Sequence, residues 1–447
     1  MPVNKRREFL RQSAMTMAGL AVVRELAPQT TVAAVPAPTT GWPDVKAQFD
    51  LDRRRLPFAS FFLVSHPRSV RLAIERYRLM LDADPYGAVE KHCFGPPEDN
   101  LSLRVKRVAA AYLGGEPGDV TLTQSTTMGL ALLYNGLTLS KGQEILITEH
   151  DHYVQQEAAR YAAVRSGASV KTIRLFDRFE DLRSISEASL VNRIRTAITP
   201  ATRVIGITWV HSESGLKLPL RAIADAVARA NAPRAERDRA LLFVDAVHGF
   251  GVEDESLATT GVDAVAAGTH KWLLAPRGTG IIWAKPQVWA RLRPSIPTFD
   301  DLDLYADWLA SRVPAGPPRA SWFTPGGFHA FEHEWAMVDG FAFHTSIGRA
   351  RVAARIHALN AQLKEGLATM PGVTLITPRS EALSAGLVGF DIAGQTAEES
   401  AARLLAKDVI ASASPYRRQV VRLSASLVND EAEVERALAA VRTVAAQ

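Results

Sequence analysis

Short, nearly continuous apolar runs alternate with longer helix-like stretches through the middle of the chain. The runs lie at 120–123, 144–148, 204–210, 241–245, 264–267 and 279–283. An apolar run without polar alternation is typical of a strand that is covered on both faces. The apolar stretch at 127–137, like the others between the runs, has the length of a helix. The pattern therefore predicts an α/β fold with a mostly parallel central sheet.

The pattern changes after residue 348. A long helix is expected from Gly348 to about Met370. Beyond it, we expect short strands at 373–376, 387–391 and 420–424 and helices at 397–406 and 431–444. This mixture predicts a second, smaller α+β domain. The expected domains are an N-terminal segment at 44–75, a large domain at 76–320 and a small domain at 321–447.

The first 43 residues have a different character. The pair Arg6-Arg7 precedes an apolar run from Ala14 to Val23, and a Pro/Thr-rich stretch lies at 36–43. This order resembles a twin-arginine export signal at 1–34 followed by a linker at 35–43. The apolar run is shorter than the roughly 20 residues that span a bilayer, so no stable membrane anchor is expected. The resemblance implies the twin-arginine translocase as a partner and a bacterial periplasmic or secreted location.

Composition and charge narrow the possible classes of protein. Hydrophobic residues make up 47% and charged residues 22% of the 447 residues, which excludes a disordered or collagen-like chain. The formal charge is +5, but residues 1–34 carry five basic and two acidic side chains, so the remainder is close to neutral. That balance does not favour nucleic acid as a partner. The single cysteine, Cys93, excludes an intrachain disulfide and a cysteine-rich metal site.

Polar residues follow several of the predicted strands at the points where they end. Ligands of open α/β sheets bind at the carboxyl ends of strands, so these residues are the candidates for a functional site. They are Gln124 to Thr127, His150, His152, His211, Ser212, Asp245, His248, His270 and Lys271. The first group stands where a helix is expected to begin, and its hydroxyl and N–H groups are suited to a phosphate.

These side chains match what pyridoxal 5′-phosphate requires. The cofactor needs a lysine for a Schiff base, a carboxylate beside its ring nitrogen, a phosphate pocket and a flat ring against it. Lys271 is the expected Schiff-base lysine, because neighbouring cations or partial desolvation would lower its pKa and make its amine a nucleophile. Asp245 is expected to face the ring nitrogen, where a charge-assisted hydrogen bond is worth about 1.5 to 3 kcal/mol.

Two segments carry a resemblance to a known family. Thr269 to Leu273, with Pro276 to Gly280 after it, and Val244 to His248 upstream are similar to the class V aminotransferases of pyridoxal-phosphate fold type I. This family includes cysteine desulfurases and isopenicillin N epimerase. The resemblance covers nearly all of the chain beyond the expected signal. It implies the fold type I architecture of a large and a small domain, and a homodimer.

The resemblance also implies roles for individual residues. The positions that match cofactor-binding residues are Ser125, Thr126, His150, His211, Ser212, Asp245, His248, His270 and Lys271. His150 is similar to the ring that stacks on the cofactor, although a register uncertain by two residues leaves His152 as the alternative. Arg422 is similar to the arginine that binds the substrate carboxylate, a task suited to guanidinium.

Two departures from the family bear on function. Desulfurases carry a catalytic cysteine on the loop before the carboxylate-binding arginine, whereas Cys93 lies far upstream. A cysteine desulfurase is therefore disfavoured. Phe328 stands where relatives use a Gly-Thr pair to reach the phosphate of the neighbouring subunit. Because Phe328 has no hydroxyl group, the sequence does not predict whether that contact forms.

The expected function is an exported pyridoxal-phosphate enzyme acting on a small-molecule substrate with an amino group. An epimerase-like activity ranks first, because the amino-acid sequences at 270–273 and 422–425 are most similar to those of isopenicillin N epimerase. An aminotransferase is the alternative, followed by a lyase or an oxygen-using tailoring enzyme. Two other classes stay open: an exported ligand-binding protein without turnover, and a metal enzyme. A metal enzyme is disfavoured. His333-Glu334 begins like the zinc-binding helix of a metalloprotease, but Met337 stands where the second histidine is required.

Overall fold

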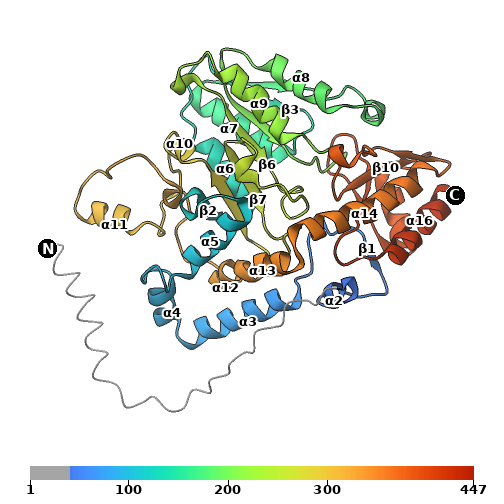
Figure 1. Ribbon diagram of the computed structural model, residues 1–447, viewed down its shortest axis with the longest axis horizontal. Coiled ribbons are helices and arrows are strands. Elements are labelled where there is room, and N and C mark those ends of the chain that lie inside the picture. Colours follow the sequence, from blue (N-terminus) through green and yellow to red (C-terminus); the bar gives the residue numbers. More distant parts are fainter. Residues whose placement is uncertain (1–40) are drawn as a thin grey trace.

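The computed structural model describes residues 41–447. The expected export signal at 1–34 and most of the expected linker lie outside these residues. Figure 1 shows a central sheet with helices on both sides and, at the right, a second layer near the C-terminus. Among residues 41–447, no helix combines the length and the apolar character needed to cross a membrane.

The central sheet has seven strands in the order β2-β8-β7-β6-β5-β3-β4. Their bounds are β2 (Val120–Thr123), β3 (Glu144–Thr148), β4 (Ser169–Ile173), β5 (Thr202–Thr208), β6 (Leu241–Asp245), β7 (Ala264–Gly268) and β8 (Gly280–Ala284). β8 is antiparallel to both of its neighbours, and the other neighbouring pairs are parallel. The predicted α/β fold with a mostly parallel sheet is confirmed. The carboxyl ends of every strand except β8 therefore meet at one edge.

Side chains on both faces of this sheet are buried. Leu242 and Val244 of β6 belong to one hydrophobic cluster, whereas Leu241 and Phe243 belong to another. Successive residues of a strand point to opposite faces, so each cluster fills one side of the sheet. Full burial of a Val, Leu or Phe side chain stabilises the fold by about 1.5 to 3 kcal/mol. This double burial explains why the strands read as unbroken apolar runs.

Helices connect and cover these strands. They are α6 (Thr126–Asn135), α7 (Tyr153–Ser166), α8 (Glu187–Ala197), α9 (Leu220–Asn231), α10 (Pro286–Trp289) and α11 (Leu302–Leu309). α6 and α7 pack against each other, as do α8 and α9. α6 begins directly after β2, where the Ser125 hydroxyl accepts a hydrogen bond from the backbone N–H of Met128. That cap fixes the start of α6 at the carboxyl edge of the sheet.

The second layer is a four-stranded antiparallel sheet in the order β12-β13-β10-β9. Its strands are β9 (Val373–Leu375), β10 (Val388–Ile392), β12 (Ser412–Ala413) and β13 (Val421–Leu423). The helices of this layer are α14 (Arg349–Ala368), α15 (Ala397–Leu405) and α16 (Glu431–Ala445). The strands and helices expected after residue 348 are thus present within a few residues of their expected bounds.

The N-terminal part of the described chain joins both layers. β1 (Leu56–Pro57) pairs in parallel with β11 (Val409–Ile410), and Ala59 forms a bridge with Ser424. The helices on this side are α2 (Trp42–Lys46), α3 (Arg68–Ala83), α4 (Pro85–His92), α5 (Leu101–Leu113), α12 (Phe331–Trp335) and α13 (Met337–Ile347). Both α12 and α13 pack against α3 and α5. Figure 1 shows the long α3 running below them.

Candidate active site

A cavity of about 210 Å³ lies at the carboxyl edge of the central sheet. We call it the cofactor cavity. The predicted site residues in its walls are Ser125, Thr126, Ser212, Asp245, His248, His270, Lys271 and Arg422. They come from the ends of β2, β5, β6 and β7 and from β13 of the second layer. The fold therefore brings most of the predicted residues together from positions up to about 300 residues apart in the sequence.

The strand register explains how the phosphate-binding candidates meet. Thr123 of β2 and Gly268 of β7 both pair with Gly280 of β8, so the segments that follow β2 and β7 leave the sheet side by side. Thr126 Oγ1 then accepts a hydrogen bond of 2.7 Å from the backbone N–H of Gly268. A Cβ at Gly268 would come within 2.8 Å of the His270 ring. The glycine thus allows the start of α6 and His270 to approach each other closely.

His270 has a defined ring orientation. Its Nδ1 lies 3.0 Å from the carbonyl oxygen of Thr279, so Nδ1 must carry a hydrogen to donate that bond. Burial lowers the pKa of the ring, and the charge of Lys271 lowers it further. Nε2 can donate to an anion only when the ring is protonated. A bound phosphate would therefore stabilise the imidazolium form of His270.

Asp245 is buried and Lys271 is half-buried in the wall of the cofactor cavity. Burial lowers the pKa of Lys271 to about 8. The negative charge of Asp245 opposes this decrease, and the positive charge of Arg422 adds to it. Burial raises the pKa of Asp245 to about 6. Asp245 Oδ1 accepts a hydrogen bond of 3.1 Å from the backbone N–H of Val247. Within residues 41–447 no hydrogen bond reaches its Oδ2, so that oxygen can receive a donor from a bound ligand.

Two hydroxyl groups meet beside these charges. Ser212 Oγ lies 2.6 Å from the hydroxyl oxygen of Tyr416, and the Tyr416 ring stands edge-on to that of His152. Burial raises the pKa of Tyr416, which keeps its proton on the oxygen. Sequence reasoning missed Tyr416. The one available signal was its place on the loop just before Arg422.

His248 is a neutral neighbour of the same cavity. Its Nδ1 accepts a hydrogen bond of 3.3 Å from the indole N–H of Trp272, and its side chain is buried. Burial lowers the pKa of His248 well below its usual value, and the charges of Lys271 and Arg422 add to the decrease. The ring is therefore uncharged at neutral pH.

Arg422 is held by its own chain. Nη1 donates to the carbonyl of Ser212, Nε and Nη2 donate to Ser412 Oγ, and Nη2 also donates to the carbonyl of Ala413. The guanidinium carbon lies 4.6 Å from the centre of the Phe61 ring, a cation–π geometry. A guanidinium has five N–H donors, and four of them are used here. In this arrangement one N–H, on Nη1, is free for a substrate carboxylate.

Neither His150 nor His211 lines the cofactor cavity. The His150 ring stacks on Phe176 instead, and the His211 ring is buried 6.0 Å from that of His150. Burial lowers the pKa of His150 to about 4 and that of His211 to about 3. His150 and His211 therefore lie outside the walls of the cofactor cavity, and His152 stands in the cavity wall where His150 was expected.

The buried carboxylate of Asp151 explains this placement. Its Oδ2 accepts a hydrogen bond from the backbone N–H of Thr148, and its Oδ1 accepts two from the N–H and hydroxyl of Thr208. These bonds hold residue 151 between the ends of β3 and β5. His152 then caps α7 as its N-terminal residue, with Nδ1 accepting from the N–H of Val154. The cap turns its ring toward the cavity.

The remaining candidates lie outside the cofactor cavity. Cys93 is half-buried in a separate cavity beside Glu334, and burial raises the pKa of its thiol to about 12. His329 bonds Glu334 through Nε2, and His333 Nδ1 bonds the carbonyl of Arg277. Phe328 is 73% exposed. Within residues 41–447, no three His, Cys, Asp or Glu side chains come together as metal ligands.

Residues 103–436 match the family model described as aminotransferase class-V. The chain belongs to the class V aminotransferase family. This membership confirms the predicted family and its cofactor, pyridoxal 5′-phosphate.

Curated relatives of this member of the class V aminotransferase family include two isopenicillin N epimerases. The one from Streptomyces clavuligerus is 27% identical over 385 residues, which cover 83% of this chain and 90% of the relative. The one from Amycolatopsis lactamdurans is 24% identical, with 78% and 84% covered. A probable cysteine desulfurase from Chlamydia trachomatis is 26% identical, with 66% and 69% covered.

Solved structures share the fold of this chain. The cystine C–S lyase C-DES superposes with a TM-score of 0.74 at 19% identity, covering 87% of this chain and 98% of that one. A cysteine desulfurase from Thermococcus onnurineus gives 0.74 at 18% identity, with 93% and 99% covered. The expected fold type I architecture is thereby confirmed.

The residues of the cofactor cavity fit pyridoxal phosphate. The free Oδ2 of Asp245 suits a protonated ring nitrogen, and the Lys271 amine, with its lowered pKa, suits a carbonyl carbon. The N–H groups at the start of α6, next to Thr126 and His270, suit a phosphate.

Proposed function

We propose that this chain is an epimerase-like pyridoxal-phosphate enzyme that acts at the α-carbon of an amino acid or an amino-acid-containing substrate. The observation that carries the proposal is the meeting of Lys271, Asp245 and Arg422 in the walls of one cavity. The similarity to isopenicillin N epimerases over most of the chain supports it.

Each wall of the cavity has a part in holding the cofactor. Lys271 attaches it covalently, Asp245 pairs with its ring nitrogen, and the start of α6 with His270 binds its phosphate. His152 lies against its ring, because it is the histidine of the 150–152 pair that lines the cavity. Bound pyridoxal phosphate supplies a conjugated ring that stabilises negative charge at the substrate α-carbon.

Proton transfer falls to the groups around Lys271. The free N–H of Arg422 would hold the substrate carboxylate, and the Lys271 amine would remove the α-proton. A pKa of about 8 leaves part of the lysine unprotonated near neutral pH, as a base requires. Inversion also needs a second proton donor. The Tyr416–Ser212 hydroxyl pair is our candidate, since Ser212 lines the cavity and Tyr416 keeps its proton.

An aminotransferase is the second candidate function, since the same residues hold an amino acid and move its α-proton. A lyase, an oxygen-using tailoring enzyme and a binding protein without turnover remain alternatives in that order. The place of Cys93 argues against a desulfurase mechanism that uses it, because its cavity is not the one that contains Lys271.

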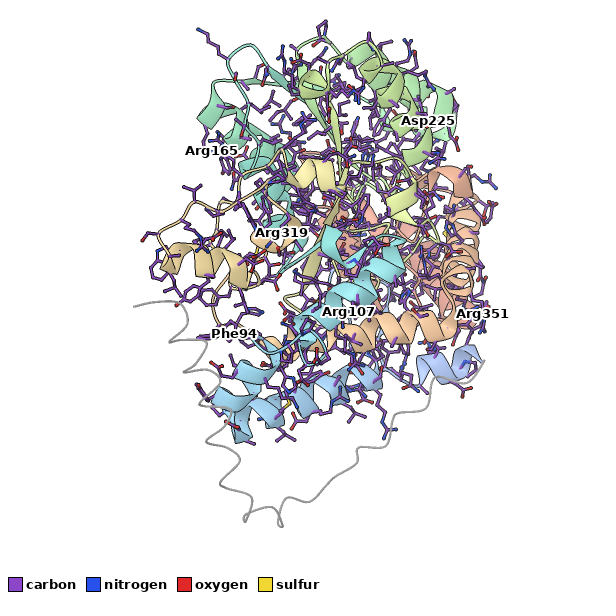
Figure 2. The ribbon with its side chains drawn as sticks, turned by 60° about the vertical axis from the view of Figure 1, so that its left-hand side comes forward. Phe94, Arg107, Arg165, Asp225, Arg319 and Arg351 are labelled. Carbon is purple, nitrogen blue, oxygen red and sulfur yellow. The ribbon has the colours of Figure 1, made fainter. Side chains whose placement is uncertain are left out.

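We also propose that the enzyme is a homodimer exported by the twin-arginine translocase. The segment around α11 projects from the body (Figure 1) and carries exposed Phe299, Trp308 and Phe328. Arg319, labelled in Figure 2, donates a hydrogen bond to the Asp301 carboxylate at the start of α11. Apolar exposure of this kind is common at protein interfaces. Light scattering tests the dimer, and periplasmic fractionation of an Arg6→Lys/Arg7→Lys variant tests the export.

The central experiment compares two buried lysines. Lys364 of α14 also has a pKa lowered to about 8 by burial, but it bonds Ser384 away from the cofactor cavity. We expect a visible absorbance band after addition of pyridoxal phosphate to the wild type and to Lys364→Met, and none with Lys271→Met. Chiral analysis of an amino-acid panel in deuterated water then separates an epimerase, which gives the opposite enantiomer, from an aminotransferase, which gives a keto acid. A band that survives in Lys271→Met would contradict the proposal.

A further inference from the structure

Lys271 lies between two cavities. Besides the cofactor cavity, it borders a second one of about 180 Å³, which we call the apolar cavity. The segment that follows β1 separates the two: Phe61 and Phe62 line the cofactor cavity, whereas Ala59 and Leu63 line the apolar cavity. The two spaces therefore meet at the residue that attaches the cofactor in the proposed function.

The walls of the apolar cavity offer little to a polar ligand. They include Leu51, Leu63, Val64, Trp272, Ile356 and Leu427. The hydroxyl oxygens of Ser60 and Ser426 lie 3.1 Å apart and bond each other. Lys271 is the one charged residue among the lining residues. An apolar group is therefore the ligand that this wall favours.

The size of the cavity limits the group that it can hold. An apolar protein cavity of about 150 Å³ accommodates benzene. At about 180 Å³, the apolar cavity has room for a branched aliphatic or phenyl side chain. It is too small for a bicyclic group carrying several polar substituents.

The carboxylate-binding arginine stands at the boundary between the two cavities. Arg422 lies on β13, and Ser426, Leu427 and Val428 of the apolar cavity follow within six residues. The Phe61 ring beneath the Arg422 guanidinium belongs to the segment that separates the cavities. A substrate at Lys271 can thus place its carboxylate toward Arg422 and its side chain toward Leu63 and Leu427.

We propose that the apolar cavity is the side-chain subsite, and that the substrate is an amino acid with a branched aliphatic or phenyl side chain. This inference rests on the proposed function, because it places the α-carbon beside Lys271. Apart from Lys271, which attaches the cofactor in the proposed function, no charged residue lines this cavity, so nothing else in it pairs with a charged side chain.

The test uses probes with and without an amino group on the protein loaded with pyridoxal phosphate. Calorimetry with 4-methylpentanoate and butanedioate measures binding without cofactor chemistry, and the change in visible absorbance measures binding of L-leucine, L-phenylalanine, L-serine and L-glutamate. Leu63→Glu places a carboxylate in the apolar cavity at a residue that is 50% exposed, so the fold should tolerate it. Leu79→Glu on α3, at 54% exposure, is the matched control.

We expect L-leucine, L-phenylalanine and 4-methylpentanoate to bind about ten- to a hundredfold more tightly than the polar probes, as burial of one such side chain predicts. Leu63→Glu should remove that preference, and Leu79→Glu should keep it. Tighter binding of polar probes, or an equal loss for all probes in Leu63→Glu, would overturn the inference. A missing Lys271-dependent band overturns the proposed function instead, and the calorimetric preference then still decides whether the cavity takes an apolar group.

Discussion

The imidazole ring of His150 lies flat against the phenyl ring of Phe176, with 3.8 Å between their centroids and 15° between their planes. This ring does not line the cofactor cavity next to Lys271. Two residues later, His152 borders that cavity. The buried Asp151 carboxylate between them separates the two rings.

This arrangement predicts different consequences for the two histidines. His152→Ala should weaken pyridoxal-phosphate binding by up to about tenfold, because a ring contact is worth about 0.5 to 1.5 kcal/mol. His150→Ala should instead lower the melting temperature and leave the dissociation constant of the cofactor unchanged. Titration by absorbance and thermal unfolding measure the two effects. The reverse result would return the stacking role to His150.

Removal of one hydroxyl tests the proposed proton donor. Tyr416→Phe keeps the ring against His152 and removes the bond to Ser212 Oγ, so we expect a loss of epimerisation of at least tenfold with the cofactor still bound. Exchange of the α-hydrogen with deuterated solvent in the unreacted enantiomer should persist, because Lys271 is intact. Tyr161→Phe, at an exposed position of α7, is the control. Equal losses of exchange and epimerisation would argue against this role for Tyr416.

The lowered pKa of Lys271 predicts how cofactor loading depends on pH. With a pKa of about 8 rather than 10.5, half of the amine is unprotonated at pH 8. The rate at which the apoprotein acquires its absorbance band should therefore rise with pH, with its midpoint near pH 8. The Asp245 carboxylate raises the pKa of Lys271, so Asp245→Asn should move the midpoint to lower pH. An unchanged midpoint in that variant would contradict the electrostatic coupling.

Glu213 provides a test of stability against pH. Its side chain is buried, no described residue hydrogen-bonds its carboxyl group, and burial raises its pKa from 4.5 to about 7. The folded protein therefore prefers protonated Glu213, and the contribution of this group to stability is complete below pH 4.5 and is lost as pH rises through 7.

Glu213→Gln replaces the titrating group with a neutral one of the same shape. We expect it to raise the free energy of unfolding at pH 8 by on the order of 1 to 3 kcal/mol and to change it little at pH 5. Thermal or urea unfolding at both values measures this. Destabilisation at pH 8 would mean that the ionised carboxylate interacts favourably with Arg418 and Arg422, the two cations that lower its pKa.

The sequence was informative where each residue acts through its neighbours in the chain. β6 and β7 are buried on both faces, so they appear as apolar runs, and the polar residues after them mark the carboxyl edge. β4 (Ser169–Ile173) is partly exposed at the edge of the sheet and has no apolar run, so it was missed. Which of His150 and His152 lines the cofactor cavity depends on hydrogen bonds that Asp151 accepts from Thr208, more than fifty residues away.

Tyr416 and the apolar cavity could not be found from local patterns. The Tyr416 hydroxyl acquires its partner 204 residues away, and a tyrosine in a polar loop gives no sign of that contact. The apolar cavity is built from segments near residues 51, 60, 272, 356, 410 and 427, each of which contributes only one to six residues. Such a space exists only after the layers have packed.

The pairing of β1 with β11 and the bridge from Ala59 to Ser424 determine when the site can exist during synthesis. The wall between the two cavities is made near the beginning of the described chain, but its partner strand β11 and Arg422 on β13 are made several hundred residues later. A nascent chain halted before residue 410 has Lys271 and the whole central sheet, yet both cavities remain open on one side. A closed site can therefore form only after residue 422 has been made, and loss of the segment that holds β11 and β13 would undo the beginning of the described fold as well.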